Sequence, residues 1–320
     1  MTILFSLLLD MLFGDPPNRF HPVAWMGSTI AALQNMAPEK DQPLKQLAYG
    51  GLLSLSGGVF FALLGRGLTA GLKRVPSPLR WLLEAGLLKT TIGLRGLDQA
   101  AGEVQSALEN GDLDTARHSL RFHLVSRDTA ELNASQAAAA TVESVAENAS
   151  DGVLGPLVYY LLGGLPAALF YRFINTADAM LGYRDREREW LGKIPARLDD
   201  LLNLLPARLS GLLIALAAGL RSRRFFPACQ TMHRDSGKTA SPNAGWPMSA
   251  MAGALNVELE KVDHYTLGEG NPAPETHHLG EARSLLKYSI LLGGILLTVL
   301  SLGRSSDSHH GSHARIYDRT

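Results

Sequence analysis

The feature that most constrains this chain is a set of apolar segments long enough to cross a membrane. Residues 47–65, LAYGGLLSLSGGVFFALLG, carry no charge, and about 19 residues at 1.5 Å each span a hydrocarbon core of roughly 30 Å. Residues 284–303 are similar, with Lys287 close enough to their start to reach the membrane interface. Two further candidates are residues 153–171 and 201–220. The sequence therefore predicts an all-α, multi-pass integral membrane protein in a lipid bilayer.

Composition favours membrane helices over the alternative, which is a set of buried helices in a large soluble bundle. Of the 320 residues, 46% are apolar and 19% are charged, and a soluble core helix is seldom uncharged on every face for about five turns. The formal net charge is zero, so no nucleic-acid partner is expected. Cys229 is the only cysteine, which excludes an intramolecular disulfide and a cysteine-based metal site.

One apolar segment has the composition of a re-entrant helix, which enters the membrane and turns back. Residues 153–171 contain Gly155, Pro156, Gly163, Gly164 and Pro166. Such residues interrupt the helices of membrane segments that line a cavity. If this segment does not cross, the polar stretches 66–152, 172–200 and 221–283 all lie on one face of the membrane.

The remaining segments complete one membrane-embedded domain, residues 1–303. Residues 3–13 are short and contain Asp10, so we expect a partly inserted or re-entrant helix instead of a cleaved signal peptide. Stretch 66–152 has leucines at helical spacing, which predicts amphipathic helices on the membrane surface: Leu82, Leu83, Leu87, Leu94 and Leu97. Residues 304–320 are rich in histidine and predict a disordered polar tail.

The first group of residues suited to chemistry is SRDTAEL, residues 126–132. Arg127 offers a planar guanidinium fork that suits phosphate or carboxylate. Asp128 or Thr129 can instead cap the following helix, with Glu131 closing a capping box from Asp128. Both interpretations stay open.

A row of acids follows in TVESVAENASDG, residues 141–152. Glu143, Glu147 and Asp151 are spaced i, i+4, i+8, which places three carboxylates on one helix face. Like charges at this spacing repel each other, and the segment holds no Lys or Arg. Mg²⁺ takes one or two carboxylates together with phosphate oxygens. The row therefore predicts a metal region, with a solvated acidic helix end as the alternative.

A third group of short polar side chains lies between residues 173 and 209: Asn175, Asp178, Asp199, Asp200 and Asn203. These residues are poor helix formers placed where membrane-flanking helices are expected. Arg197 and Arg208 are near enough in sequence to make a plain salt-bridge lattice instead. Further on, SGKT at 236–239 lacks the first glycine and the preceding strand of a phosphate-binding loop. That motif is rejected, although Arg234 and Lys238 can meet phosphate as isolated charges.

The stretch SPNAGWPMSAMAGAL, residues 241–255, fixes a turn and then has almost no side chains. Pro242 and Pro247 restrict the backbone around Asn243 and Gly245. The small residues that follow let a helix come close to a bulky ligand, or to a neighbouring helix.

Taken in order, these motifs resemble those of the membrane-bound adenosylcobinamide-phosphate synthases of cobalamin biosynthesis. The matching stretches are LLLDMLFGDPPNRFHPVAWMG near the start, SRDT at 126–129, ESVAENASDG at 143–152, NTADAMLGYR at 175–184, ARLDDLLNLLPARL at 196–209 and SPNAGWPMSAMAGAL at 241–255. The resemblance runs from about Leu7 to about Leu300. Departures at Ala149, Ser150 and Ala179 remove no charged group from a motif.

This resemblance implies a ligase that uses ATP and Mg²⁺ as cofactors. It would join adenosylcobyric acid to (R)-1-aminopropan-2-ol, as its O-phosphate, to give adenosylcobinamide phosphate; use of the free amine stays open. On the matching positions we expect catalytic roles for Arg127, Asp128, Asp178, Asp199 and Asp200, and metal binding by Glu143, Glu147 and Asp151. Substrate or nucleotide binding is expected of Thr129, Asn148, Asn175, Tyr183, Arg184, Asn203, Arg208, Asn243, Gly245 and Trp246.

The resemblance also implies a multi-pass protein of the cytoplasmic (inner) membrane, with its active site facing the cytoplasm and with other membrane enzymes of cobamide assembly as partners. A non-catalytic membrane sensor of the same family is one alternative, and it would be expected to lose parts of SRDT and ESVAEN, which are present here. A transporter is the other, and it would not need so many acids beside arginines outside the membrane.

Overall fold

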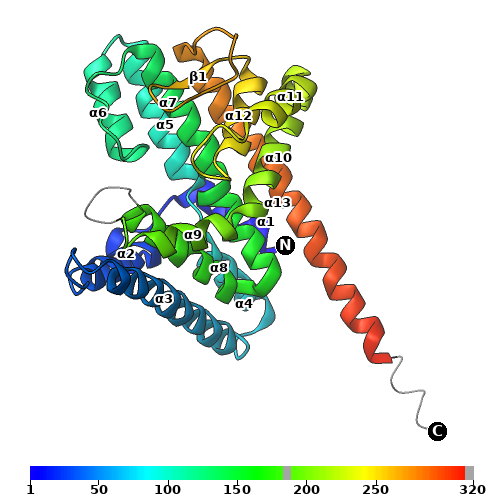
Figure 1. The fold of residues 1–320 in the computed structure, drawn as a ribbon. Helices are drawn as coiled ribbons and strands as arrows, with labels where there is room; N and C mark the ends of the chain where they lie inside the picture. The colour runs from blue at the N-terminus through cyan, green and yellow to red at the C-terminus, as the bar shows by residue number, and fades with distance from the viewer. Residues whose placement is uncertain (183–188, 314–320) are drawn as a thin grey trace.

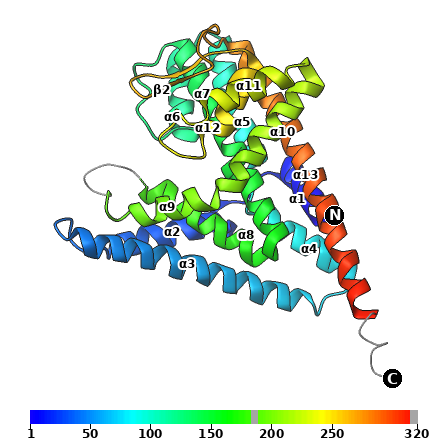
Figure 2. The same ribbon diagram turned by 45° about the vertical axis from the view of Figure 1, so that its right-hand side comes forward.

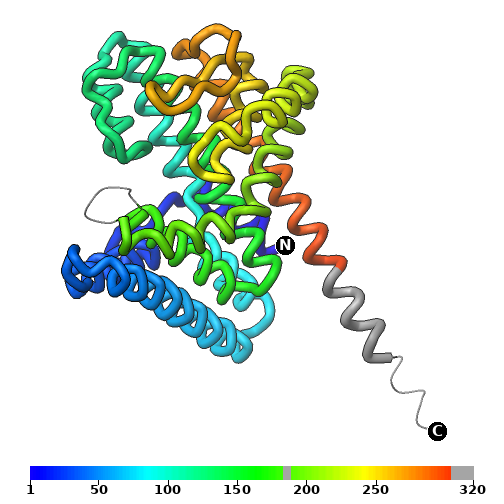
Figure 3. The backbone as a smooth tube through the Cα atoms, viewed as in Figure 1, coloured from blue at the N-terminus to red at the C-terminus, as the bar shows by residue number. Residues whose placement is uncertain are grey.

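The computed structural model describes residues 1–182 and 189–313, with side chains described as far as Gly303. These residues are helical almost throughout, and their one sheet is a two-stranded antiparallel hairpin. Figures 1 and 2 show two layers, with α10 and α13 running between them. The tube in Figure 3 shows the same path, in which the chain enters the lower layer twice, at α1–α4 and again at α8–α9. The predicted tail, residues 304–320, lies beyond the part of the chain that is described in full.

Most helices belong clearly to one layer. The lower layer contains α1 (Thr2–Phe13), η1 (Asn18–Phe20), α2 (Pro22–Gln34), α3 (Pro43–Leu72), α4 (Ser77–Lys89), α8 (Gly155–Leu181) and α9 (Lys193–Leu202). The upper layer contains α5 (Leu94–Glu109), α6 (Leu113–His123), α7 (Ala134–Asn148), α11 (Phe225–Asp235), α12 (Gly245–Leu255), β1 (Leu259–Lys261) and β2 (Tyr265–Leu267). The connecting elements are η2 (Ala149–Leu154), α10 (Leu204–Ser222) and α13 (Thr276–His313).

The structure confirms the multi-pass helical architecture. By length and composition, four helical segments could cross a membrane: Pro43–Leu72, Ala134–Leu181, Leu204–Ser222 and Thr276–Gly303. Each contains or overlaps one of the apolar segments that the sequence predicted. On α3, the face that packs on α8 and α9 is rich in glycine, whereas the opposite face exposes large apolar side chains suited to lipid: Leu52, Leu55, Val59, Phe60 and Leu63.

The break predicted within residues 153–171 is present in the structure. Within α8 the backbone leaves the helical region at Gly163 (φ −145°) and Gly164 (φ 68°), and a positive φ favours glycine. The two arms fold back on each other, with the rings of Tyr159 and Tyr171 stacked at a centroid distance of 4.9 Å. The segment therefore forms a hairpin, and its two ends lie near each other.

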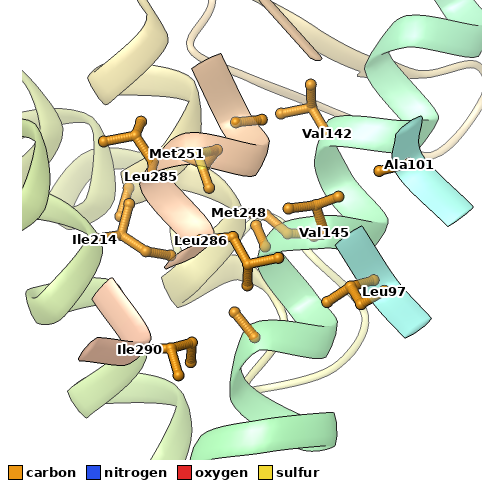
Figure 4. Packing of buried hydrophobic residues seen from close by; sticks show 14 of the residues in the cluster. Leu97, Ala101, Val142, Val145, Ile214, Met248, Met251, Leu285, Leu286 and Ile290 are labelled. Carbon is orange, nitrogen blue, oxygen red and sulfur yellow. The ribbon is translucent and has the colours of Figure 1, made fainter. Parts of the chain in front are cut away.

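Helix α7 occupies the centre of the upper layer. It begins with a capping box formed by Asn133 and Gln136, so the predicted capping box from Asp128 to Glu131 is wrong. The alanine-rich helix is buried on all sides, where small side chains let α5, α12 and α13 pack closely around it. Figure 4 shows Val142 and Val145 of α7 among buried side chains from these helices.

The amphipathic stretch before α7 forms one helix with an exposed apolar face, α4, and one helix whose apolar face is buried in the protein core, α5. Helix α4 exposes Leu79, Leu82 and Leu83, as expected of a helix at a membrane surface. Helix α5 instead buries Leu94 and Leu97 in the core of the upper layer, so the prediction of a surface helix is wrong there. An apolar face can be covered by protein as well as by lipid, and the two coverings select the same periodicity.

The segment of small residues in α12 is a helix contact. A Cβ atom added at Gly253 would lie 2.6 Å from the Pro227 carbonyl oxygen and 2.8 Å from the Cα of Ala228, both in α11. At Gly253, therefore, the small side chain allows a neighbouring helix to come close, and the bulky-ligand interpretation is wrong.

Candidate functional site

Two adjoining cavities open where the layers meet. The larger measures about 560 Å³ and is lined by Glu147, Asp151, Asp178, Gly182, Ala196, Asp199, Asp200, Lys238, Thr239, Ala240, Ser241, Lys261, His264 and Tyr265. The smaller measures about 160 Å³ and is lined by Leu124, Val125, Ser126, Arg127, Ala140, Glu143, Ser144, Glu147, Lys261 and Tyr265. They share Glu147, Lys261 and Tyr265, so one wall belongs to both.

The larger cavity collects acids from four separate elements. Glu147 comes from α7, Asp151 from η2, Asp178 from α8, and Asp199 and Asp200 from α9. The segment η2 is a π-helix, a form often found at functional sites because it widens the helix and redirects its side chains. The predicted acid row is divided between the cavities: Asp151 lines the larger one, Glu143 lines the smaller one and Glu147 lines both.

Asp199 is buried and held at both of its carboxylate oxygens. Asn175 Nδ2 donates to Oδ1 at 3.2 Å, and Asn203 Nδ2 donates to Oδ2 at 2.9 Å. Tyr171 in turn donates to Asn203 Oδ1 at 2.7 Å, which sets the orientation of that amide. Burial raises the pKa of Asp199 to about 6, although the two amide hydrogen bonds lower it in part. Asn175 and Asn203, predicted to bind substrate, thus contact the carboxylate that lines the cavity.

Arg172 lies beneath these acids and was not predicted as a site residue. Its Nη1 donates to Asn175 Oδ1 at 3.1 Å, and it lies 3.5 Å from the backbone oxygen of Asp151. Its buried Nε has no hydrogen-bond partner among the described residues. Its position next to the NTADAML motif is the only sequence signal that could have singled it out.

A chain of contacts through Asn243, Arg208 and Trp246 holds the backbone of Asp200 in the wall of the larger cavity. Asn243 Nδ2 donates to the backbone oxygen of Asp200 at 2.7 Å, and Arg208 Nη1 donates to Asn243 Oδ1 at 3.0 Å. The Arg208 guanidinium lies 4.8 Å from the centre of the Trp246 ring. These predicted binding residues do not line the larger cavity. Gly245 packs against the backbone oxygen of Ser236, and a Cβ atom there would collide with it.

Positive charge reaches the cavities from the segment after α10. Lys238 lines the larger cavity, as the sequence allowed, and pairs with Asp235 at 3.0 Å. Arg234 pairs with the same aspartate at 2.8 Å and lines neither cavity. Lys261 and Tyr265, from the β1–β2 hairpin, were missed by sequence reasoning. Their hairpin shows as the short alternation LEKVDHYTL, which lies in a stretch otherwise without apolar periodicity.

The SRDT motif is divided in the same way. Arg127 lines the smaller cavity, and its Nη2 lies 3.9 Å from Glu143 Oε2. The side chain of Asp128 is 74% exposed and pairs with Arg121 at 2.8 Å. Thr129 donates to the Arg117 backbone oxygen at 2.9 Å, and Asn148 donates to the Ser144 backbone oxygen at 2.9 Å. None of these three lines either cavity. Tyr183 and Arg184 lie outside the described residues.

The donors in the larger cavity suit a hard cation that is also bound by other ligands. Carboxylate oxygens are the protein ligands that Mg²⁺ prefers, and Mg²⁺ commonly uses only one or two of them. Among the described residues, no three His, Cys, Asp or Glu side chains are grouped closely enough to hold a metal ion by themselves. Glu147 and Asp151 therefore fit Mg²⁺ that is shared with phosphate oxygens or water better than a closed protein site.

Comparison with known proteins agrees with this arrangement of motifs. The family model described as CobD/Cbib protein matches residues 3–288. "Cobalamin biosynthesis protein CobD" of Dehalococcoides mccartyi is 44% identical over 269 residues, which cover 84% of this chain and 86% of that relative. "Probable cobalamin biosynthesis protein CobD" of Methanothermobacter thermautotrophicus is 36% identical over 306 residues, covering 93% of this chain and 98% of that relative. "Cobalamin biosynthesis protein CobD" of Klebsiella pneumoniae is 39% identical over 274 residues, covering 83% and 84%. No solved structure matches.

The family model and these relatives together show that the chain belongs to the CobD/CbiB family of cobalamin biosynthesis proteins.

Proposed function

We propose that the chain is an ATP-dependent ligase that joins the propionate carboxyl of adenosylcobyric acid to the amine of (R)-1-aminopropan-2-ol, carried as its O-phosphate, to give adenosylcobinamide phosphate. The observation that carries this proposal is the convergence of acids from α7, η2, α8 and α9 on one cavity that also holds Lys238 and Lys261. Activation of a carboxylate by ATP needs both kinds of charge in one place.

The reaction requires two steps. The carboxylate attacks the γ-phosphorus of ATP to give an acyl phosphate, and ADP leaves. The amine nitrogen then forms a bond to the acyl carbon, phosphate leaves and the nitrogen loses a proton. In the first step Mg²⁺, held by Glu147 and Asp151, would neutralise phosphate charge. Lys238, which lines only the larger cavity, would hold the negative groups in position.

Asp199 suits the proton transfer of the second step. Its pKa of about 6 keeps the carboxylate charged at neutral pH, yet leaves it more basic than an ordinary aspartate. Its contacts with Asn175 and Asn203 hold it in one orientation. We place Asp178 and Asp200 beside it as further carboxylates of the same wall, and we assign Asp128 no catalytic role.

The cellular setting belongs to the same proposal. Four apolar helical segments support an integral membrane protein. We place it in the cytoplasmic (inner) membrane. The cavities would face the cytoplasm, because the ATP that the reaction consumes is present on that side. Neighbouring membrane enzymes of cobamide assembly would supply the corrinoid and receive the product.

The test is product formation by purified protein in detergent, with adenosylcobyric acid, ATP, Mg²⁺ and either the amine or its O-phosphate. We expect adenosylcobinamide phosphate by mass spectrometry, and a loss of more than about tenfold in rate for Glu147→Gln. Asp128→Asn is the matched control, since it removes a carboxylate that lies outside both cavities. Failure of the wild type to form an amide with either amine would contradict the proposal and favour a binding role.

A further inference from the structure

The smaller cavity has the size of a small metabolite. Its 160 Å³ would hold about five water molecules at roughly 30 Å³ each. A nucleotide or a corrinoid could place only one end in this space, whereas a three-carbon amino alcohol ester would fit within it. The cavity adjoins the larger one along Glu147, Lys261 and Tyr265, so a ligand within it would lie beside the acids described above.

The Glu143 carboxylate has one oxygen, Oε1, that accepts no hydrogen bond from the described part of this cavity. Its side chain is 7% exposed and the Tyr265 hydroxyl lies close to the carboxylate, yet Oε1 is buried and no side chain among the described residues donates to it with hydrogen-bond geometry. Oε2 lies 3.9 Å from Arg127 Nη2, which is too long for a hydrogen bond. A buried carboxylate oxygen without a donor is unfavourable, so its retention points to a ligand that supplies the donor.

Positive charge lines the same small cavity. Arg127 and Lys261 both line it, together with the hydroxyl-bearing residues Ser126 and Ser144. The Ser144 hydroxyl donates to the Leu124 backbone oxygen at 2.8 Å, so the two cations and Ser126 are the groups suited to a phosphate monoester. Since Glu143 and Glu147 line the cavity as well, it suits a ligand that is itself both cationic and anionic.

We propose that the smaller cavity is the binding site for the amine substrate, a compact phosphate ester with a primary ammonium group. The ammonium lies against Glu143, and the phosphate lies against Arg127 and Lys261. Glu143 and Lys261 thereby become the residues that select this ligand. The identity of the ligand rests on the proposed function, whereas the site rests on the charges and size of the cavity.

The shared wall gives this placement a mechanistic consequence. An amine held at Glu143 lies one helix turn from Glu147, which lines both cavities, and so lies next to the space in which the corrinoid carboxyl would be activated. The phosphate end stays in the smaller cavity, which separates it from the phosphates of ATP. Two phosphate-bearing substrates can then occupy the protein together without competing for the same cations.

The test is direct binding by equilibrium dialysis with full-length protein in detergent, without ATP or corrinoid. The probes are (R)-1-aminopropan-2-ol O-phosphate, the free amino alcohol and inorganic phosphate. We expect the ester to bind at least tenfold more tightly than either fragment. Lys261→Gln should weaken the ester and inorganic phosphate about tenfold, and Glu143→Gln should weaken the ester and the free amine. Lys238→Gln, a charge-matched change that lines only the larger cavity, should leave ester affinity unchanged.

Melting temperatures in the same detergent show whether each variant is folded. If Glu143→Gln fails to accumulate, Lys261→Gln and its Lys238→Gln control decide the question. Ester affinity unchanged in Lys261→Gln, or reduced equally in Lys238→Gln, would overturn the proposal. Failure of the ligase proposal can be told apart from failure of this one. If the ester binds as expected but no amide forms, the binding site stands and the ligase proposal fails. If an amide forms but ester binding does not depend on Lys261, the ligase proposal stands and the binding site is wrong.

Discussion

At the scale of the residue, environment separates aspartates that look alike in the sequence. Asp128 and Asp199 both lie in motifs of the family, but Asp128 is exposed and paired with Arg121, whereas Asp199 is buried in the cavity wall. Hydrogen bonds to its own charged form lower the pKa of Asp128, and burial raises the pKa of Asp199 to about 6. Of these two aspartates, it is Asp199 that is suited to exchange a proton near neutral pH.

The pKa of Asp199 predicts a pH dependence for the ligase reaction. If Asp199 must accept a proton, kcat/KM for amide formation should fall about tenfold per pH unit below about pH 6. Asp199→Asn should reduce the rate more than about a hundredfold. Rates measured from pH 5 to 8 check both statements. A wild-type kcat/KM that stays constant between pH 5 and 7 would contradict them.

The same pKa has a consequence for stability. Because the pKa of about 6 in the folded protein exceeds the ordinary aspartate pKa of 3.8, the folded protein binds this proton more tightly than the unfolded chain does. The contribution of Asp199 to the free energy of unfolding therefore falls as pH rises from about 4 to 6. At pH 8 the melting temperature of Asp199→Asn should not drop as its activity does. A large drop in melting temperature would show that the variant loses activity by unfolding.

At the scale of the element, the hairpin of α8 connects membrane packing to the site. Its first arm begins at Gly155, directly against the hydroxyl of Tyr171 on the second arm. Tyr171 in turn holds Asn203, which holds Asp199. The close approach of the arms thus fixes the orientation of a cavity residue through two hydrogen bonds. Only glycine allows it, because any Cβ atom at residue 155 would collide with the tyrosine.

Gly155→Ala should accordingly lower both stability and activity. Overpacking in a tight contact typically costs about 1–3 kcal/mol, and displacement of Tyr171 would release Asn203. The matched control is Gly86→Ala in α4, where an added Cβ would meet nothing within 4 Å and should stabilise the helix by about 0.5–1 kcal/mol. Thermal unfolding and product formation are measured for both variants. Equal melting temperatures for the two would show that the arms can separate without cost.

At the scale of the whole molecule, the hairpin affects topology. An α8 that returns to its starting side leaves the upper layer and α9 on the same face of the membrane. Asp114 and Arg197 have side chains that are 94% and 70% exposed. The variants Asp114→Cys and Arg197→Cys should therefore react with an impermeant maleimide from the same side. The background is Cys229→Ser, since Cys229 is the only native cysteine, and a permeant maleimide controls for reactivity. Labelling of the two positions from opposite sides would show that the segment crosses.

Much of the architecture follows from local sequence alone. The long apolar segments predicted membrane helices because an uncharged surface on every face excludes water. The break within residues 153–171 was predicted because glycine and proline act on the backbone at their own positions, and the reversal occurs at Gly163 and Gly164. The acids of residues 143–151 were singled out as a row of like charges with no Lys or Arg in the segment, and Asp178, Asp199 and Asp200 as poor helix formers where membrane-flanking helices are expected.

Only the tertiary structure decided which of these groups meet. Glu147 and Asp199 lie in helices far apart in sequence, and they reach one cavity because α8 folds back and brings α9 beneath α7. Lys261 and Tyr265 carry no motif and become part of the site through the packing of β1 and β2 near α7 and α12. Gly253 was ambiguous because a close approach looks the same in sequence whether a ligand or a helix makes it. Sequence periodicity reports whether a face is covered, and packing over long distances in the chain determines what covers it.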